Sequence, residues 1–131
     1  MNKKEKGDLA ELQVASELIR VGWKVLFPYG EDHRYDLVAE RQGNYRRIQV
    51  KYATPNNGVL NVNCRSSNNW SVINYSAEDI DVLAVFNPES SVVYFIPVSE
   101  INKSLFKLRL VDTKNLQEKK IHPAEQFLVL S

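Results

Sequence analysis

The feature that most constrains the fold is the stretch Arg34–Ala53, in which two β-rich segments flank a turn signal. Asp36–Glu40 and Tyr45–Tyr52 mix β-branched or aromatic residues with polar ones, as half-buried strands do. The sequence "RQGN" between them is short and contains Gly beside Asn, which favours a β-hairpin. We therefore expect a sheet built around this hairpin.

One face of the expected hairpin brings an aspartate, a glutamine and a lysine together. A two-residue loop at Gln42–Gly43 would place Asp36 opposite Gln49, whereas a loop at Gly43–Asn44 would place it opposite Lys51. Because residues two apart on a strand share a face, either register puts the three polar side chains on one side. A three-residue loop would break this arrangement unless a β-bulge compensates.

A helix is expected before the hairpin, over Gly7–Val21, because apolar residues recur there at helical spacing. Gly22 is expected to end this helix. The apolar residues that show the spacing are Leu9, Leu12, Ala15, Leu18 and Ile19. Glu11 shares a side with two of them, at i+4 and i+7, so it would lie at the edge of the face that packs on the sheet.

The rest of the chain consists of β-rich segments separated by turn signals. Four segments are predicted to be strands, the last two forming a central hairpin: Trp23–Pro28, Val59–Arg65, Ile80–Asn87 and Ser91–Ile101. The polar segment Ser66–Asp79 is predicted to be a loop, and Lys107–Val111 a further strand. His122–Leu130 fits either a helical turn or a closing strand. The chain is thus expected to be a mixed sheet with an N-terminal helix, of α/β or α+β class, in one domain spanning residues 1–131.

Composition excludes several classes of protein. Cys64 is the only cysteine and the chain has 2 histidines, which argues against a disulfide framework and a zinc site. The formal net charge is only +1, so any basic surface must be local. No signal-peptide core or membrane-spanning apolar run is present, and a cytoplasmic location without membrane association is expected.

The predicted polar face implies a particular chemistry. If Glu11 and Asp36 lie close together, their carboxylates repel each other, and a divalent cation would relieve this repulsion. Oxygen ligands favour Mg²⁺, with Mn²⁺ as an alternative. A lysine such as Lys51 beside the metal and a phosphate would stabilise developing negative charge. These roles fit phosphodiester hydrolysis.

The order of these residues resembles the PD-(D/E)xK nuclease superfamily. The matching features are Gly7-x-x-x-Glu11 on a first helix, Asp36 opening the second strand, and Gln49-x-Lys51 on the third. The order of elements is similar to the Holliday-junction-resolvase-like branch. The downstream sequence "YSAEDIDVLAVFN…VYFIPVSEI" is similar to the small cyanobacterial group I intron homing endonucleases in that branch. The resemblance covers about residues 6–101.

The resemblance implies a role for each matching residue. Asp36 would be the principal metal ligand, Lys51 the catalytic lysine, Glu11 an auxiliary acidic ligand, and the Val50 carbonyl a further ligand. The chain departs from the family motif at two positions. Tyr35 replaces a proline that shapes the strand, and Gln49 replaces the usual second acid, bringing an amide oxygen without charge.

Residues 54–75 are predicted to form a strand and loop insertion that reads DNA. Within it, Leu60, Val62 and Cys64 alternate with the polar Asn61, Asn63 and Arg65. Asn suits adenine and Arg suits guanine in the major groove, which admits a two-stranded β-ribbon. The alternative is an edge strand whose polar face is merely solvated. The further predicted DNA contacts are Ser67, Asn69, Lys6, Arg46 and Arg47.

These features together predict an Mg²⁺-dependent, sequence-specific endonuclease of the homing type that cuts double-stranded DNA. A single site cuts one strand, so a dimer or a dimer of dimers is expected. The alternatives are a structure-selective Holliday junction resolvase and a catalytically inactive DNA-binding descendant. Cys64 is expected to be buried, His33 to lie on a solvated loop, and Trp23, Trp70, Tyr75, Tyr94 and Phe95 to be core or interface residues.

Overall fold

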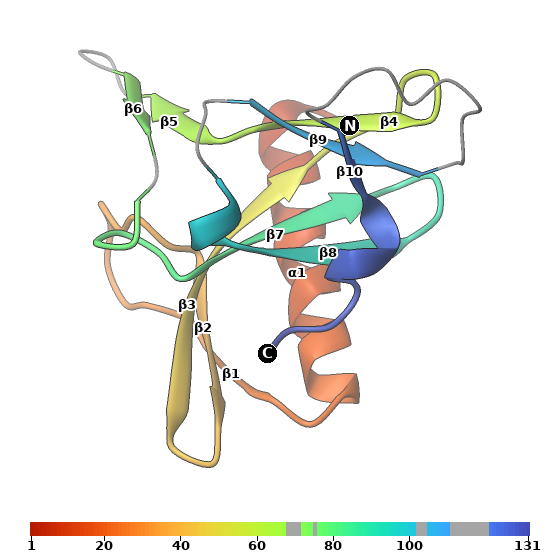
Figure 1. Cartoon of the computed structure of the whole chain (residues 1–131). Helices are drawn as coiled ribbons and strands as arrows, with labels where there is room; N and C mark the ends of the chain where they lie inside the picture. Colours follow the sequence, from red (N-terminus) through yellow and green to blue (C-terminus); the bar gives the residue numbers. More distant parts are fainter. Residues whose placement is uncertain (68–71, 75, 102–104, 111–120) are drawn as a thin grey trace.

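The computed structural model describes residues 1–67, 72–74, 76–101, 105–110 and 121–131 (Figure 1). The elements in these ranges are α1 (Lys3–Arg20), β1 (Lys24–Leu26), β2 (Leu37–Arg41), β3 (Asn44–Tyr52), β4 (Val59–Asn63), β5 (Arg65–Ser67), β6 (Val72–Asn74), β7 (Val82–Asn87), β8 (Val92–Pro97), η1 (Val98–Glu100), β9 (Leu105–Arg109), β10 (Ile121–Pro123) and η2 (Ala124–Phe127). None of the helices in these ranges has the length and apolar character needed to cross a membrane.

Local signals define both ends of α1. The Asn2 side chain accepts a hydrogen bond from the Glu5 backbone N–H at 2.8 Å, and the Glu5 side chain accepts one from the Asn2 N–H at 3.1 Å. This reciprocal pair is a capping box. At the other end, Gly22 adopts a φ of 98°. The N–H groups of Gly22 and Trp23 donate to carbonyls of the last turn, which closes the helix. The predicted end of the helix is confirmed.

The buried face of α1 differs in part from the predicted one. Its buried residues are Ala10, Val14, Ala15 and Leu18. Leu12 and Ile19, by contrast, are 64% and 62% exposed. The helix therefore carries apolar residues on more than one face. The small Ala10 lies on the buried one, where it lets the helix backbone approach the sheet.

The main sheet has five strands in the order β1-β2-β3-β7-β8 (Figure 1). Strands β3 and β7 are parallel, and all other neighbours are antiparallel. Every residue of β7 is buried, because α1 covers one face of this strand and a second sheet covers the other. The predicted hairpin of two β-rich segments around "PESS" is confirmed as β7 and β8.

The β2–β3 hairpin closes through a two-residue loop at Gln42–Gly43. Both loop residues have positive φ, 53° and 79°, as this type of tight hairpin requires. Glu40 pairs with Tyr45, and Leu37 pairs with Ile48. The same register continued by one residue places Asp36 opposite Gln49. Of the two registers left open by the sequence, the structure contains the first.

A second sheet, in the order β10-β9-β4, covers the far side of β7 and β8. Side chains from β4 and β9 bury against alternate residues of β7 and β8, including Leu83 and Ile96. The molecule is thus layered as helix, mixed sheet and small sheet, which confirms an α+β fold with an N-terminal helix (Figure 1).

Two segments differ from or complete the sequence prediction. Val72–Asn74 is a strand paired with β5, although the polar composition of Ser66–Asp79 predicted a loop. The C-terminal segment contains both structures that were left open, a strand (β10) and a helical turn (η2). Trp23, Tyr94 and Phe95 are buried as predicted, and so is Cys64. Trp70, Tyr75 and Asn69 lie outside the described residues or side chains.

Candidate active site

Asp36 is fixed at the point where β2 begins. Its backbone N–H donates to the Ile48 carbonyl at 2.8 Å. Its carboxylate Oδ2 accepts a hydrogen bond from the Val50 backbone N–H at 2.7 Å. The side chain thus takes the place of a β2 backbone group and continues the ladder beside β3. One carboxylate oxygen is anchored, and Oδ1 takes no part in that hydrogen bond.

The same hydrogen bond sets the direction of the Val50 carbonyl. In an extended strand the N–H and C=O groups of one residue point to the same side. Because the Val50 N–H points toward Asp36, the Val50 C=O points to that side as well. The carbonyl oxygen is therefore directed toward the region that Asp36 borders.

Glu11 lies on α1 within electrostatic range of Asp36, and both carboxyl groups are half-buried. Burial raises the pKa of Glu11, and the negative charge of Asp36 raises it further. Burial also raises the pKa of Asp36, against the opposing effects of the Val50 N–H and the Lys51 cation. Both shifts mean that this position disfavours the two negative charges unless another cation is present.

Lys51 points to the same side of β3 as Gln49, since the two residues are two positions apart. Burial lowers the pKa of the Lys51 amino group, while the Asp36 carboxylate opposes this shift. The structure thus brings Glu11, Asp36 and Lys51 into one electrostatic group. Gln49 lies on the strand beside them.

This donor set suits a hard divalent cation. The described residues contain no cluster of three or more His, Cys, Asp or Glu side chains, because Gln49 stands where a second strand acid would be. The available donors are two carboxylates, an amide oxygen and a backbone carbonyl, all of them oxygen. Oxygen-only sites favour Mg²⁺ over softer metals. The raised pKa values of the two carboxyls identify the charge that a cation would neutralise.

The N-terminus of α1 lies beside the end of β3. The Lys6 Nζ atom is 5.7 Å from the centre of the Tyr52 ring. The positive charge of Lys3 contributes to lowering the pKa of Lys51, so these two amines are also near one another. Lys6 therefore stands next to the candidate site, and its role as a phosphate contact stays a prediction.

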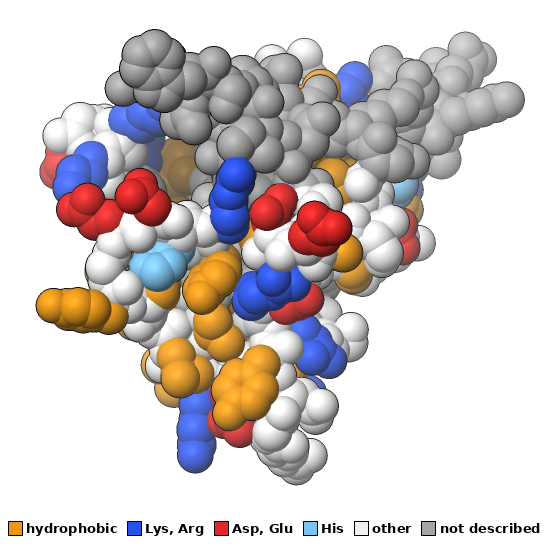
Figure 2. Space-filling view, turned by 90° about the vertical axis from the view of Figure 1, so that its left-hand side faces the viewer, with side chains coloured by type: hydrophobic (Ala, Val, Ile, Leu, Met, Phe, Trp, Pro, Cys, Tyr) orange, Lys and Arg blue, Asp and Glu red, His pale blue; other side chains and the backbone are white. Residues whose placement is uncertain are grey.

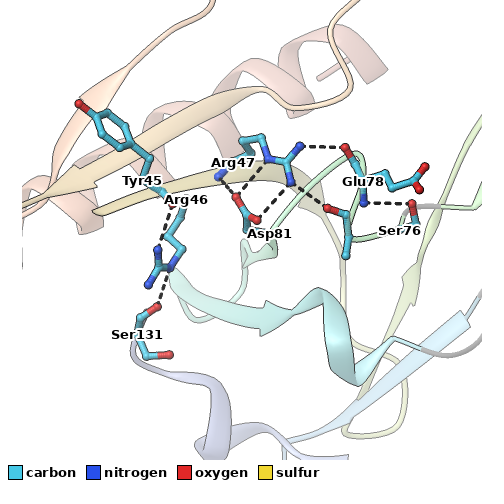
Figure 3. A network of polar contacts seen from close by, with 8 residues as sticks. Tyr45, Arg46, Arg47, Ser76, Glu78, Asp81 and Ser131 are labelled. Carbon is cyan, nitrogen blue, oxygen red and sulfur yellow. Dashed lines mark hydrogen bonds and ion pairs between the residues drawn. The ribbon is translucent and has the colours of Figure 1, made fainter. Parts of the chain in front are cut away.

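Arg47 on β3 binds to the segment that precedes β7 (Figure 3). Its side chain and backbone N–H donate to Asp81 at 2.7 to 3.2 Å. It also donates to the carbonyls of Ala77 and Glu78 at 2.8 Å each. The Arg47 guanidinium thus links β3 to the turn before β7, and the DNA contact expected at Arg47 stays a prediction.

Arg46 also contacts the chain itself (Figure 3). Its side chain donates to the Ser131 and Tyr45 carbonyls at 3.0 Å each. Arg46 and Arg47 precede Lys51 on β3 by five and four residues. The sequence missed these roles because Asp81 and Ser131 are distant along the chain.

The predicted polar strand is partly described. Leu60, Val62 and Cys64 are buried, and Asn61 and Asn63 are exposed, so the alternation is confirmed over β4. Arg65 and Ser67 lie in β5, which pairs with β6. Asn69 falls outside the described residues. His33 is exposed, with a ring nitrogen 2.8 Å from the Tyr29 carbonyl oxygen, as a residue of a solvated loop would be.

Two basic residues on β9 were not predicted to be functional. Lys107 pairs with Asn61, and Arg109 pairs with Val59, across the antiparallel β4–β9 ladder. The alternation in "LFKLR" was a signal for them, since Phe106 and Leu108, which alternate with them, are buried. The pairing partner of the strand was not visible in the sequence.

Two carboxylates and a lysine on this fold are suited to metal-assisted hydrolysis. Comparison with known proteins gives the family. The family model described as PD-(D/E)XK endonuclease matches residues 1–130, and the chain belongs to this family. Nucleases of this family typically use divalent metals. A search of curated proteins found no match.

Two solved structures are similar over most of the chain. The bacterial homing endonuclease I-Ssp6803I shares 27% identity, with a TM-score of 0.75, over 97% of this chain and 88% of that one. The Holliday junction resolvase Hjc from the archaeal hyperthermophile Archaeoglobus fulgidus shares 20% identity, with a TM-score of 0.51, over 79% of this chain and 84% of that one. The second likeness concerns the fold alone.

Proposed function

We propose that this chain is a sequence-specific, Mg²⁺-dependent endonuclease of the homing type, acting on double-stranded DNA. The observation that carries the proposal is the group of Glu11, Asp36 and Lys51, and the exposed amide side chains of Asn61 and Asn63 on β4 are consistent with it. The similarity to I-Ssp6803I over nearly the full length of both chains supports it. Residues 54–75 would be the DNA-reading insertion.

Each side chain of the site has a role in this reaction. Asp36, Glu11, the Gln49 amide and the Val50 carbonyl would hold the metal ion. When bound, the ion would supply Lewis acidity and a water of lowered pKa. Lys51 would place its positive charge beside the scissile phosphate and stabilise the negative charge that develops there. The anchored Oδ2 of Asp36 keeps the site in register with β3.

Cleavage of fragmented genomic DNA, followed by sequencing of every new end, tests the proposal. We expect ends at one long motif, present with Mg²⁺ and absent with EDTA. Lys51→Ala should reduce cleavage by at least about 100-fold, as expected for loss of a charge that acts in the transition state. DNA binding should be nearly unchanged. Arg20→Ala, at an exposed cation near the C-terminal end of α1, is the control and should cleave normally.

Two other results would assign a different function. Cleavage of four-way junctions without a preferred sequence would identify a junction resolvase. DNA binding without cleavage of either substrate would identify an inactive descendant, and Gln49 is the specific observation that favours this second candidate. Normal cleavage by the Lys51→Ala chain would contradict the assignment of the site.

We further propose that the enzyme acts as a homo-oligomer, a dimer or a dimer of dimers, since one site cuts one strand. The face of β1–β3 opposite α1 carries Leu26, Val38 and Tyr45, as their pairing shows. The apolar cluster that the structure describes between the main sheet and the small sheet includes no residue of β1, β2 or β3. Among the described residues, these three side chains therefore stay uncovered. Figure 2 shows an apolar strip on this side of the molecule. Strips of this kind mark contact surfaces.

A further inference from the structure

Strands β4 and β9 form a two-stranded ribbon whose two faces differ sharply. The inner face consists of Leu60, Val62, Phe106 and Leu108, all buried against the main sheet. Because opposite residues in an antiparallel pair share a face, the outer face consists of three cross-strand pairs. These pairs are Val59 with Arg109, Asn61 with Lys107, and Asn63 with Leu105.

The chemistry of the outer face matches base edges better than phosphates. None of its six residues is acidic, and only two are basic. Phosphate binding alone would favour a row of lysines and arginines. Two amides and a leucine that is 48% exposed instead offer the donors, acceptors and apolar contact that distinguish bases. The Leu105 side chain has no donor for a phosphate oxygen.

The dimensions of the ribbon fit a major groove. The groove is about 12 Å wide and admits a two-stranded ribbon. Successive outward pairs lie about 7 Å apart along the strands, which is about two base-pair steps of DNA. Three pairs therefore reach about five base pairs.

The ribbon also has a defined direction relative to the candidate active site. Cys64, which follows Asn63 directly, interacts electrostatically with Lys51, so this end of the ribbon lies next to the site. The pair of Asn63 and Leu105 is therefore the outward pair nearest the candidate active site. Arg109 lies two pairs farther along the ribbon, a spacing of about four base-pair steps.

We propose that β9 supplies half of a two-stranded base-reading ribbon, with Leu105, Lys107 and Arg109 as specificity-determining residues. Lys107 and Arg109 donate to the O6 and N7 acceptors of guanine, and Leu105 contacts the methyl group of thymine. The inference rests on the proposed function, because it assigns the residues through which the DNA sequence is read.

Binding selection from a random-sequence duplex pool tests the base contacts. The Lys51→Ala background separates binding from cleavage. Relative to that background, Lys107→Ala or Arg109→Ala should remove a guanine preference of about 5- to 150-fold at one or two adjacent positions, the range for one base contact. The Arg20→Ala control should select an unchanged motif. Equal weakening on all sequences, or an unchanged motif in the β9 variants, would overturn the proposal.

The Leu105 contact is tested by removing its two apolar groups, the leucine side chain and the thymine methyl, separately and together. Replacing the contacted thymine of the selected motif with deoxyuridine should weaken binding by the wild-type chain. The Leu105→Ala chain should bind both duplexes equally, because the contact is already lost. Full sensitivity to deoxyuridine in the Leu105→Ala chain would contradict the assignment.

Cross-linking tests groove insertion without depending on a motif or on cleavage. Cys64 is the only cysteine and is 1% exposed, so Lys107→Cys adds one accessible thiol. We expect its thiolate to attack a duplex that carries a mixed-disulfide tether on cytosine N4, in the major groove, forming a protein–DNA disulfide and releasing the small thiol. Arg20→Cys is the control and should not cross-link. Tight binding with no excess cross-linking at position 107 would overturn the insertion of the ribbon into the major groove and leave the proposed function standing. Failure of the wild-type chain to bind DNA would overturn the proposed function as well.

Discussion

Asp36 is half-buried and, to bind a metal ion, it must be ionised in a position where burial raises its pKa. Asp36→Asn keeps a hydrogen-bond acceptor for the Val50 N–H but removes the charge. We therefore expect it to stabilise the metal-free protein at neutral pH by about 1 kcal/mol, or about 3–5 °C in Tm. Thermal unfolding in EDTA measures this difference.

The pH and metal dependence of the same variant provide the controls. A carboxyl whose folded-state pKa is raised destabilises the fold above that pKa, and this effect is lost as pH falls through it. The gap between Asp36→Asn and the wild type should therefore shrink in mild acid. Mg²⁺ should stabilise the wild type and leave the variant unchanged. A variant that is less stable than the wild type in EDTA would contradict the inference that burial destabilises the ionised Asp36 carboxylate.

Cys64 gives a second prediction for a single residue. Burial raises the pKa of its thiol to about 11, although the nearby Lys51 cation opposes the shift. The thiol is therefore protonated at pH 8, and only the thiolate is a good nucleophile. Iodoacetamide should leave the native chain unmodified and label it fully in denaturant. Mass spectrometry reads the labelling, and rapid native labelling would show that the second sheet does not cover Cys64.

The positions of single residues could be predicted where their partners are near in the sequence. Asp36, Gln49 and Lys51 were placed on one face because a short hairpin allows only two simple registers. Glu11 was placed beside them by helical spacing together with the family resemblance. Arg47 could not be placed, since its partner Asp81 is 34 positions away in the sequence and nothing in a local pattern joins the two.

At the scale of elements, the link between β3 and the turn before β7 depends on Asp81. Burial alone would raise the pKa of Asp81, but hydrogen bonds from the Arg47 side chain and backbone outweigh it and lower the pKa. Asp81→Asn should destabilise the fold by roughly 1–2 kcal/mol at neutral pH, since hydrogen bonds to charged groups are strong but this pair is partly solvated. Urea unfolding measures the loss.

The pH dependence of that loss follows from the lowered pKa. A carboxyl of this kind stabilises the fold above its unfolded-state pKa, and the contribution disappears as pH falls through the folded-state value. The variant and the wild type should therefore converge in strong acid. Glu31→Gln, at an exposed loop glutamate, is the control and should change little at any pH. A constant difference down to the lowest pH would show that the charge of Asp81 does not matter.

Elements themselves were predicted well where the local pattern is strong. The helix, the β2–β3 hairpin and the β7–β8 hairpin follow from spacing, turn residues and apolar runs. Strand β6 was missed because its neighbourhood is rich in Ser and Asn, which favour loops. The β4–β9 pairing joins segments more than forty residues apart, and its register depends on tertiary packing rather than on propensity.

At the scale of the whole molecule, the layers that the structure describes leave part of one sheet face uncovered. The helix protects one side of all five strands, but among the described residues the small sheet covers only β7 and β8 on the other. Tyr45 and Leu26, on the uncovered part, are 58% and 46% exposed. If two copies bury this face, a charge placed there must be desolvated in the complex and should weaken association.

Tyr45→Glu should therefore shift the protein from an oligomer toward a monomer in light scattering, by at least about tenfold in the dissociation constant. The matched control is Leu12→Glu on the outer face of α1, where the wild-type side chain is 64% exposed. A monomer retains one complete site, so the Tyr45→Glu chain should still nick one strand of its target while it loses coupled double-strand cleavage. Unchanged mass together with unchanged double-strand cleavage would move the contact between copies to another face.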